Sequence, residues 1–269
     1  MILEHRRDWM VAVITLAHPP VNALNLALRQ ALYDFFGAAR TDASIEAVVV
    51  HGAGGGFCAG GDRKEFGTPS ANECPTLSRD VLDAIERCGK PVIAALHGYA
   101  MGGGLELALA CAARVVVADT RVALPEVSIG VFPLSATQRL PRLIGVARAS
   151  EFMLAGAVRA ASDSSLTACF DRIVPSQDEL LQVALEAARE AIAAPPVPVR
   201  ERPIPGDPIA ELRRVLERHS GDALSPAARA LLRAVSAAVE APNFQAGLDR
   251  AQALFDELGG TRRPSPPVR

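Results

Sequence analysis

The chain has 269 residues, of which 49% are apolar, and its 28 basic and 30 acidic residues leave a net charge of −2. This length allows one large hydrophobic core with a small additional subdomain. The even charge balance lacks the basic signature of a nucleic-acid-binding or membrane-surface protein. We therefore expect small molecules, or further copies of this chain, as partners, with no nucleic acid and no membrane.

The five cysteines have neither CxxC nor zinc-type spacing, which argues against a disulfide framework and against a structural metal site. The N-terminal segment lacks the pattern of a cleaved signal peptide, and no charge-free apolar run is long enough to cross a membrane. We therefore expect a cytoplasmic protein without a bound metal.

Apolar runs and helical periodicity predict the elements of the first half of the chain. Strands are expected at 9–16, 45–51, 91–96 and 114–118, and amphipathic helices at 26–40 and 77–88. Asn22 or Asn25 is expected to cap the first helix, because a short polar side chain can accept a hydrogen bond from the first helical turn.

Three consecutive glycines, Gly102 to Gly104, precede a run at 105–111 that is apolar on all faces. Such a helix is expected in the core. The bare glycine backbone of its first turn presents unpaired N–H groups, which favour negative charge. This segment is therefore a candidate for stabilising an oxyanion.

Two acidic residues accompany this helix. Glu106 falls in its first turns, where burying a charge is costly without a reason, and Glu126 follows the strand at 114–118 and a turn. If the chain returns to the helix start, two carboxylates would flank one pocket and suit acid/base chemistry beside a carbonyl. The residues alone equally allow Glu106 to stabilise the helix dipole and Glu126 to lie on the surface.

Residues 52–66 contain six glycines within ten positions, so that the backbone could approach a ligand closely. Glycine content alone is more typical of a flexible surface loop. The spacing matches neither a dinucleotide-binding nor a P-loop motif, and the G-x-S-x-G motif of serine hydrolases is absent from the sequence.

The segments GYAMGGGLELALACAARVVVAD (98–119) and LPEVSIGVFP (124–133) resemble the signature of the crotonase (enoyl-CoA hydratase/isomerase) superfamily. The resemblance implies an α/β fold, a spiral of ββα repeats that assembles through trimers. It also implies that Glu106 and Glu126, which stand at the two acidic positions of the hydratases, act on the substrate.

The segment FCAGGDRKE (57–65) is similar to the motif that binds coenzyme A in this family. The resemblance implies that the backbone N–H groups of Gly61 and Gly103 hold the thioester oxygen. The residues implied to bind the substrate and coenzyme A are Ala59, Gly61, Asp62, Arg63, Lys64 and Gly103. Because coenzyme A would arrive as part of the substrate, no separate cofactor is expected.

Residues 133–137, PLSAT, depart from the family pattern, which has a glycine-rich stretch one residue longer. In the hydratases that loop helps to position the attacking water. The departure therefore favours double-bond isomerisation as an alternative to hydration, whereas it leaves binding of coenzyme A unaffected.

Six prolines within the fourteen residues 195–208 forbid a helix and suggest an extended connector. We expect a spiral core at 1–195, a proline-rich connector at 196–208, a C-terminal helical region at 209–260 and a mobile tail at 261–269. Helices are predicted at 177–194, 209–219, 226–239 and 243–258. The last part resembles the segment that follows the hydratase half of multifunctional β-oxidation proteins.

The sequence therefore predicts an enoyl-CoA hydratase that adds water to a 2-enoyl-CoA and gives 3-hydroxyacyl-CoA. Glu106 would help to deprotonate the water, and Glu126 would deliver a proton to C2. The alternatives are an enoyl-CoA isomerase and a non-catalytic acyl-CoA-binding protein. A homotrimer or homohexamer is expected by analogy with the family.

Overall fold

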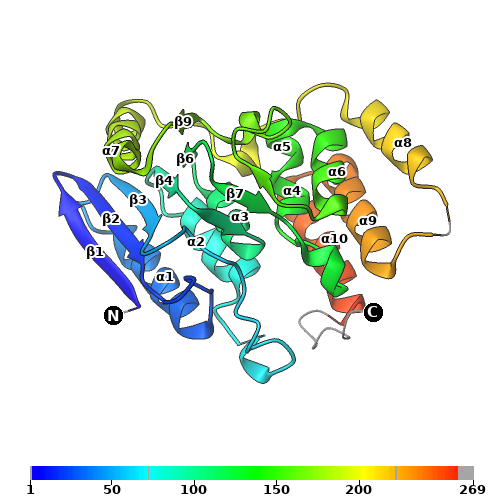
Figure 1. Cartoon of the computed structure of the whole chain (residues 1–269), viewed down its shortest axis with the longest axis horizontal. Helices are drawn as coiled ribbons and strands as arrows, with labels where there is room; N and C mark the ends of the chain where they lie inside the picture. Colours follow the sequence, from blue (N-terminus) through cyan, green and yellow to red (C-terminus); the bar gives the residue numbers. More distant parts are fainter. Residues whose placement is uncertain (1, 72, 222, 260–269) are drawn as a thin grey trace.

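The computed structural model describes residues 2–71, 73–221 and 223–259, and it contains two β-sheets with helices around them (Figure 1). The larger sheet has the strand order β1-β2-β3-β4-β6-β9. Its strands are β1 (Leu3–Asp8), β2 (Val11–Leu16), β3 (Ala47–Gly52), β4 (Val92–Leu96), β6 (Ala113–Val117) and β9 (Arg172–Val174). β1 is antiparallel to β2, and the remaining neighbours are parallel. The central strands are buried on both faces, as their continuous apolar runs predict.

The smaller sheet is formed by β5 (Tyr99–Met101), β7 (Arg121–Ala123) and β8 (Arg159–Ala160). The chain passes from β4 to β5 through Gly98, whose positive φ of 62° and contact with the Gly55 carbonyl exclude a side chain. The chain then enters α3 (Gly103–Ala110). It crosses from the larger to the smaller sheet a second time where β6 leads to β7. These crossings are the strand-strand-helix repeat that was predicted.

Helices cover both faces of the larger sheet (Figure 1). One face packs against α7 (Gln177–Ala193) through small and β-branched side chains such as Val49, Ile93 and Ala188. The other face packs against the helices α1 (Leu26–Ala39), α2 (Leu82–Glu86) and α3. Asn25 caps α1 by accepting a hydrogen bond from Leu28 N, which confirms one of the two predicted caps.

The C-terminal part is helical, with α8 (Pro208–Arg218), α9 (Pro226–Glu240) and α10 (Phe244–Glu257). These helices pack beside the short helices α4 (Ala136–Arg139), α5 (Pro141–Ile144) and α6 (Val146–Ala155) (Figure 1). The three predicted C-terminal helices are therefore present. The domain limits at 195 and 208 stay a prediction, and the predicted tail at 261–269 lies outside the described residues.

Two predictions about local structure are wrong. Residues 77–88 do not form one α-helix: Leu77–Val81 form a π-helical turn, and only Leu82–Glu86 are α-helical. The Asp80 side chain accepts from both the N–H and the hydroxyl of Thr76, and Val81 N donates to Thr76 O, which closes the wide turn. The strand predicted from residue 9 begins at Val11, because Trp9 lies in the β1–β2 turn with a φ of 55°.

Candidate active site

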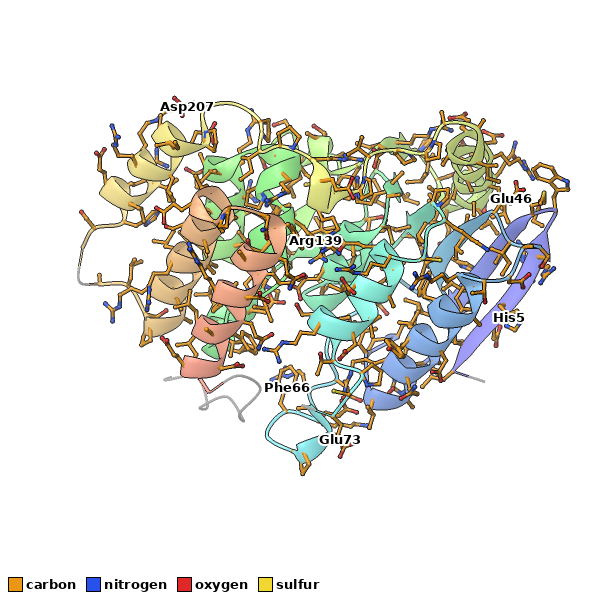
Figure 2. The ribbon with its side chains drawn as sticks, turned by 180° about the vertical axis from the view of Figure 1, so that it is seen from behind. His5, Glu46, Phe66, Glu73, Arg139 and Asp207 are labelled. Carbon is orange, nitrogen blue, oxygen red and sulfur yellow. The ribbon has the colours of Figure 1, made fainter. Side chains whose placement is uncertain are left out.

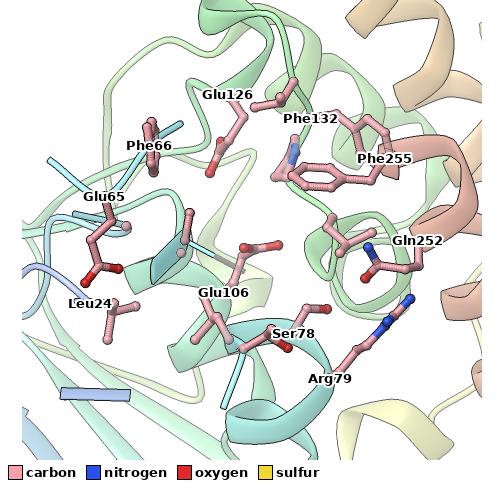
Figure 3. A pocket seen from close by; sticks show the side chains of 18 of the residues that line it. Leu24, Glu65, Phe66, Ser78, Arg79, Glu106, Glu126, Phe132, Gln252 and Phe255 are labelled. Carbon is pink, nitrogen blue, oxygen red and sulfur yellow. The ribbon is translucent and has the colours of Figure 1, made fainter. Parts of the chain in front are cut away.

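A cavity of about 440 Å³ lies between the glycine loops, the π-helical turn and the C-terminal helix α10 (Figure 3). Five residues named from the sequence line it: Gly61, Asp62, Gly103, Glu106 and Glu126. Three others do not: Ala59, Arg63 and Lys64 are adjacent in sequence, but the cavity wall does not include them. The structure therefore brings the two predicted carboxylates and the two predicted backbone donors into one site.

The two glycine segments lie close to each other, and a side chain on Gly60 would collide with the backbone of the other segment. A Cβ on Gly60 would lie 2.6 Å from the Met101 carbonyl oxygen and 3.1 Å from Gly103 N. A Cβ on Gly103 would lie 3.6 Å from Gly61 N. Gly103 is the first residue of α3, so its N–H has no acceptor within the helix. Gly61 and Gly103 thus line the cavity close to each other, near the positive end of the α3 dipole.

Glu106 is held by the loop that follows Pro133. Its Oε1 accepts hydrogen bonds from Ser135 N at 2.7 Å, Ser135 Oγ at 3.0 Å and Ala136 N at 2.9 Å. Burial raises the pKa of Glu106, and these three donors, together with the positive charge of Arg139, oppose the rise. The three hydrogen bonds hold the Glu106 carboxylate in position, and only 6% of the residue's surface is exposed.

Glu126, in contrast to Glu106, has a buried carboxylate oxygen without a hydrogen-bond donor among the described residues. It begins a 3-10 turn, Glu126–Ile129, and its Oε1 lies 2.6 Å from where a Cβ on Gly102 would be. Its Oε2 has no access to solvent and no hydrogen-bond partner within the described residues. Burial and the neighbouring Glu106 carboxylate raise the pKa of Glu126 to about 8. Burial and the neighbouring carboxylate therefore favour the protonated form of Glu126.

A buried ion pair positions the loop at 62–76 beside the cavity, and the sequence reasoning did not find it. Arg29 donates to Glu65 Oε2 at 2.7 Å and to the carbonyl oxygens of Leu24, Ser70 and Pro75. Glu65 Oε1 in turn accepts from Leu26 N. Glu65 belongs to the motif at 57–65, but nothing in the sequence pattern pairs it with a helical arginine.

The wall contributed by α10 was also missed. Phe255 packs edge to face on Phe132 with the ring centroids 5.6 Å apart, and Gln252 lies beside it (Figure 3). Gln252 and Phe255 follow the two glutamates by more than a hundred positions, so no local spacing could have indicated them. His97 lies outside the cavity and contacts the Gly54 carbonyl oxygen through Nε2 at 3.1 Å.

Within residues 2–71, 73–221 and 223–259, no cluster of three or more His, Cys, Asp or Glu side chains could hold a metal ion. None of the helices in this part of the chain is long and apolar enough to cross a membrane.

Comparison with known proteins identifies relatives of this chain. The protein-family model described as enoyl-CoA hydratase/isomerase matches residues 6–201. The peroxisomal bifunctional enzyme of Danio rerio is 42% identical over 186 residues, which cover 69% of this chain and 25% of that protein. The probable enoyl-CoA hydratase of Bacillus subtilis (strain 168) is 42% identical over 154 residues, which cover 55% of this chain and 60% of that protein. The chain thus matches less than two thirds of the length of either relative.

A solved structure extends the similarity to the whole chain. The crystal structure of enoyl-CoA hydratase from Bacillus anthracis aligns with a TM-score of 0.67 at 26% identity, covering 100% of both chains. This similarity confirms the predicted α/β spiral fold with C-terminal helices.

Proposed function

The chain belongs to the enoyl-CoA hydratase/isomerase family, and we propose that it adds water across the double bond of a 2-enoyl-CoA to form a 3-hydroxyacyl-CoA. One observation carries the proposal. Two carboxylates, Glu106 and Glu126, flank one cavity beside two backbone N–H donors, and their hydrogen-bonding environments are unequal. Such an inequality is what a reaction needs when one group accepts a proton and another gives one.

The glycine N–H groups supply the electrostatic part of the reaction. Attack on C3 moves the double-bond electrons through C2 and C1 onto the thioester oxygen, which becomes an enolate. Gly61 and Gly103 would donate to this oxygen, and each such donor typically stabilises a transition state by about 3 kcal/mol. The dipole of α3 adds to their effect because Gly103 is its first residue.

The two glutamates divide the proton transfers. Glu106 has three hydrogen-bond donors that favour its ionised form, so it serves as the base that removes a proton from water. Glu126, with a pKa of about 8, carries the proton that is delivered to C2. After one turnover the proton taken by Glu106 has to pass to Glu126, and this transfer restores the starting state.

Double-bond isomerisation is the second candidate. It needs only one carboxylate to shuttle a proton between C2 and C4, and Glu126 alone could do so. The apolar wall formed by Val131, Phe132, Pro133 and Leu134 favours it, since the loop that positions water in the hydratases is altered here. A non-catalytic acyl-CoA-binding protein is less well supported, because simple binding gives no reason to bury two acids.

The substrate class follows from the proposal. Coenzyme A would enter as part of the thioester, with Asp62 and the loop at 62–76 beside it, and the steps above use only carboxylates and backbone donors. We also propose a homo-oligomer of three or six copies, by analogy with the family.

The test mixes purified protein with crotonyl-CoA and, separately, with a long-chain 2-enoyl-CoA, and follows the loss of enoyl-thioester absorbance. The molecular mass of each product is then measured by mass spectrometry. Gain of one water supports hydration. If no water is added but a 3-enoyl-CoA is converted, the chain is an isomerase, and tight binding without any turnover would identify it as a binding protein.

A further inference from the structure

A second cavity, of about 240 Å³, adjoins the candidate active site. Three residues line both cavities: Ser78 and Arg79 of the π-helical turn, and Gln252 of α10. In Figure 3, Glu65 and Phe66 lie on one side of the two glutamates, whereas Arg79 and Gln252 lie on the other. A thioester with its coenzyme A near the loop at 62–76 would therefore extend its acyl chain toward the shared wall.

The shared wall is polar, in contrast to the apolar wall at 131–134. Ser78 Oγ is buried and has no hydrogen-bond partner in the described part of the chain. Among the described residues, the carboxylate that Arg79 approaches is that of Asp256, at 4.0 Å, and the Arg79 side chain is 61% exposed. Gln252 donates to Asp256 Oδ1 at 2.8 Å. A buried hydroxyl and an exposed guanidinium thus lie on the wall that the two cavities share.

The second cavity is lined with charged side chains. Arg139 and Glu86 form a doubly hydrogen-bonded pair at 2.7 and 3.0 Å, and both side chains are 1% exposed. Figure 2 shows Arg139 in the interior, between α2 and α10. Arg200 pairs with Asp83 at 2.9 Å and with Glu86 at 3.4 Å. Asp83 and Glu86 are therefore already paired with arginines, whereas Asp249, which also lines this cavity, accepts a hydrogen bond from Gln245.

One hydrogen-bond donor that faces these residues has no acceptor in the part of the chain that the structure describes. Arg139 Nη1 is buried and has no partner among the described residues, although the other nitrogens of Arg139 bond to Glu86. A buried donor without an acceptor costs free energy, and an apolar chain end would leave that cost in place. An acceptor with negative charge would satisfy Arg139 Nη1, Ser78 Oγ or Arg79.

We propose that the enzyme accepts 2-enoyl-CoA esters whose acyl chain ends in a carboxylate, which binds at the junction of the two cavities. The proposal rests on the proposed function, because it assigns the acyl chain of that substrate. Arg79 and Ser78 bind the terminal carboxylate, and Arg139 Nη1 is the further donor for chains long enough to reach it.

The experiment compares pairs of 2-enoyl-CoA esters of equal length, one ending in a methyl group and the other in a carboxyl group. For each pair, the ratio of kcat/KM values is measured in the wild type, Ser78→Ala, Arg79→Met and Arg233→Met. Arg233→Met is a matched control, because Arg233 is 68% exposed and approaches Glu257 of α10 at 3.8 Å but lines neither cavity.

We expect the wild type to prefer the carboxylate ester at one or more chain lengths. Arg79→Met should lower that preference by about fivefold, the size typical of a solvent-accessible charged contact, and Ser78→Ala should lower it as well. Arg233→Met should retain it. Hydration of the methyl-ended esters without any preference for the carboxylate would overturn this inference while leaving the proposed function intact.

If no ester is hydrated, the proposed function fails, and calorimetry still tests the acyl-chain site. The saturated acyl-CoA ending in a carboxyl group should bind more tightly than its methyl-ended counterpart, and Arg79→Met should remove the difference. Equal or weaker binding of the carboxylate ester at every length would overturn the inference.

Discussion

Ser135 donates both its backbone N–H and its hydroxyl to one carboxylate oxygen of Glu106, at 2.7 and 3.0 Å. This serine lies in the shortened loop at 133–137 that, from the sequence, put the hydration step in question. In the structure the same loop fixes the candidate base through three hydrogen bonds. The departure from the family pattern therefore supplies a hydroxyl donor to the candidate base.

Ser135→Ala should reduce kcat/KM for hydration about 10- to 100-fold at neutral pH, which corresponds to the loss of one hydrogen bond to a charged group. Loss of the hydroxyl destabilises the ionised form of Glu106 and raises its pKa. The acidic limb of the pH–rate profile should therefore move to higher pH. Ser220→Ala, at an exposed position, is the control, and an unchanged pH profile for Ser135→Ala would contradict the positioning role.

Glu126→Gln should lower kcat by about 10²- to 10⁴-fold, the range expected when a general acid is lost. The amide has nearly the shape of the carboxyl group, so the circular dichroism spectrum and thermal unfolding should remain close to those of the wild type. Glu106→Gln should have a comparable effect, and the double variant should lose much less than the product of the two. A folded Glu126→Gln protein with the full hydration rate would refute the acid/base assignment.

The raised pKa of Glu126 also predicts how stability depends on pH. Its value of about 8 in the folded protein lies above the ordinary value of 4.5, so the folded state binds this proton more tightly than the unfolded state does. The contribution is fully present below pH 4.5 and is lost as the pH rises toward 8, by up to about 1.4 kcal/mol per pH unit. The free energy of unfolding, measured with urea at a series of pH values, should fall less steeply with rising pH in Glu126→Gln than in the wild type. Identical slopes would show that Glu126 does not titrate in this range.

Gly103→Ala places a methyl group between the two glycine N–H donors. The added Cβ would lie 2.7 Å from Leu77 Cδ2, the end of a flexible side chain, and 3.6 Å from Gly61 N. The fold should persist after a small shift of Leu77, whereas kcat should fall about 10²- to 10³-fold, as for loss of an oxyanion donor. Gly37→Ala, in α1 with no atom within 4 Å of the new Cβ, is the matched control. Equal activity of the two variants would argue against an oxyanion site at Gly103.

The sequence by itself determined the elements with strong local patterns. Apolar runs located the central parallel strands, and helical periodicity located α1, α7 and the C-terminal helices. β1 was not predicted, because this edge strand is mostly exposed and lacks an apolar run. The short strands β5, β7 and β8 were missed because two or three residues carry no detectable period.

The same division holds for the candidate site. The motifs at 57–65 and 98–133 indicated the glycine donors and both glutamates, because each motif is a short continuous segment. Only the tertiary structure decided that Ser135 holds Glu106 and that Gln252 and Phe255 close the cavity. These contacts join segments far apart in the chain, and packing rather than local spacing determines which of them meet.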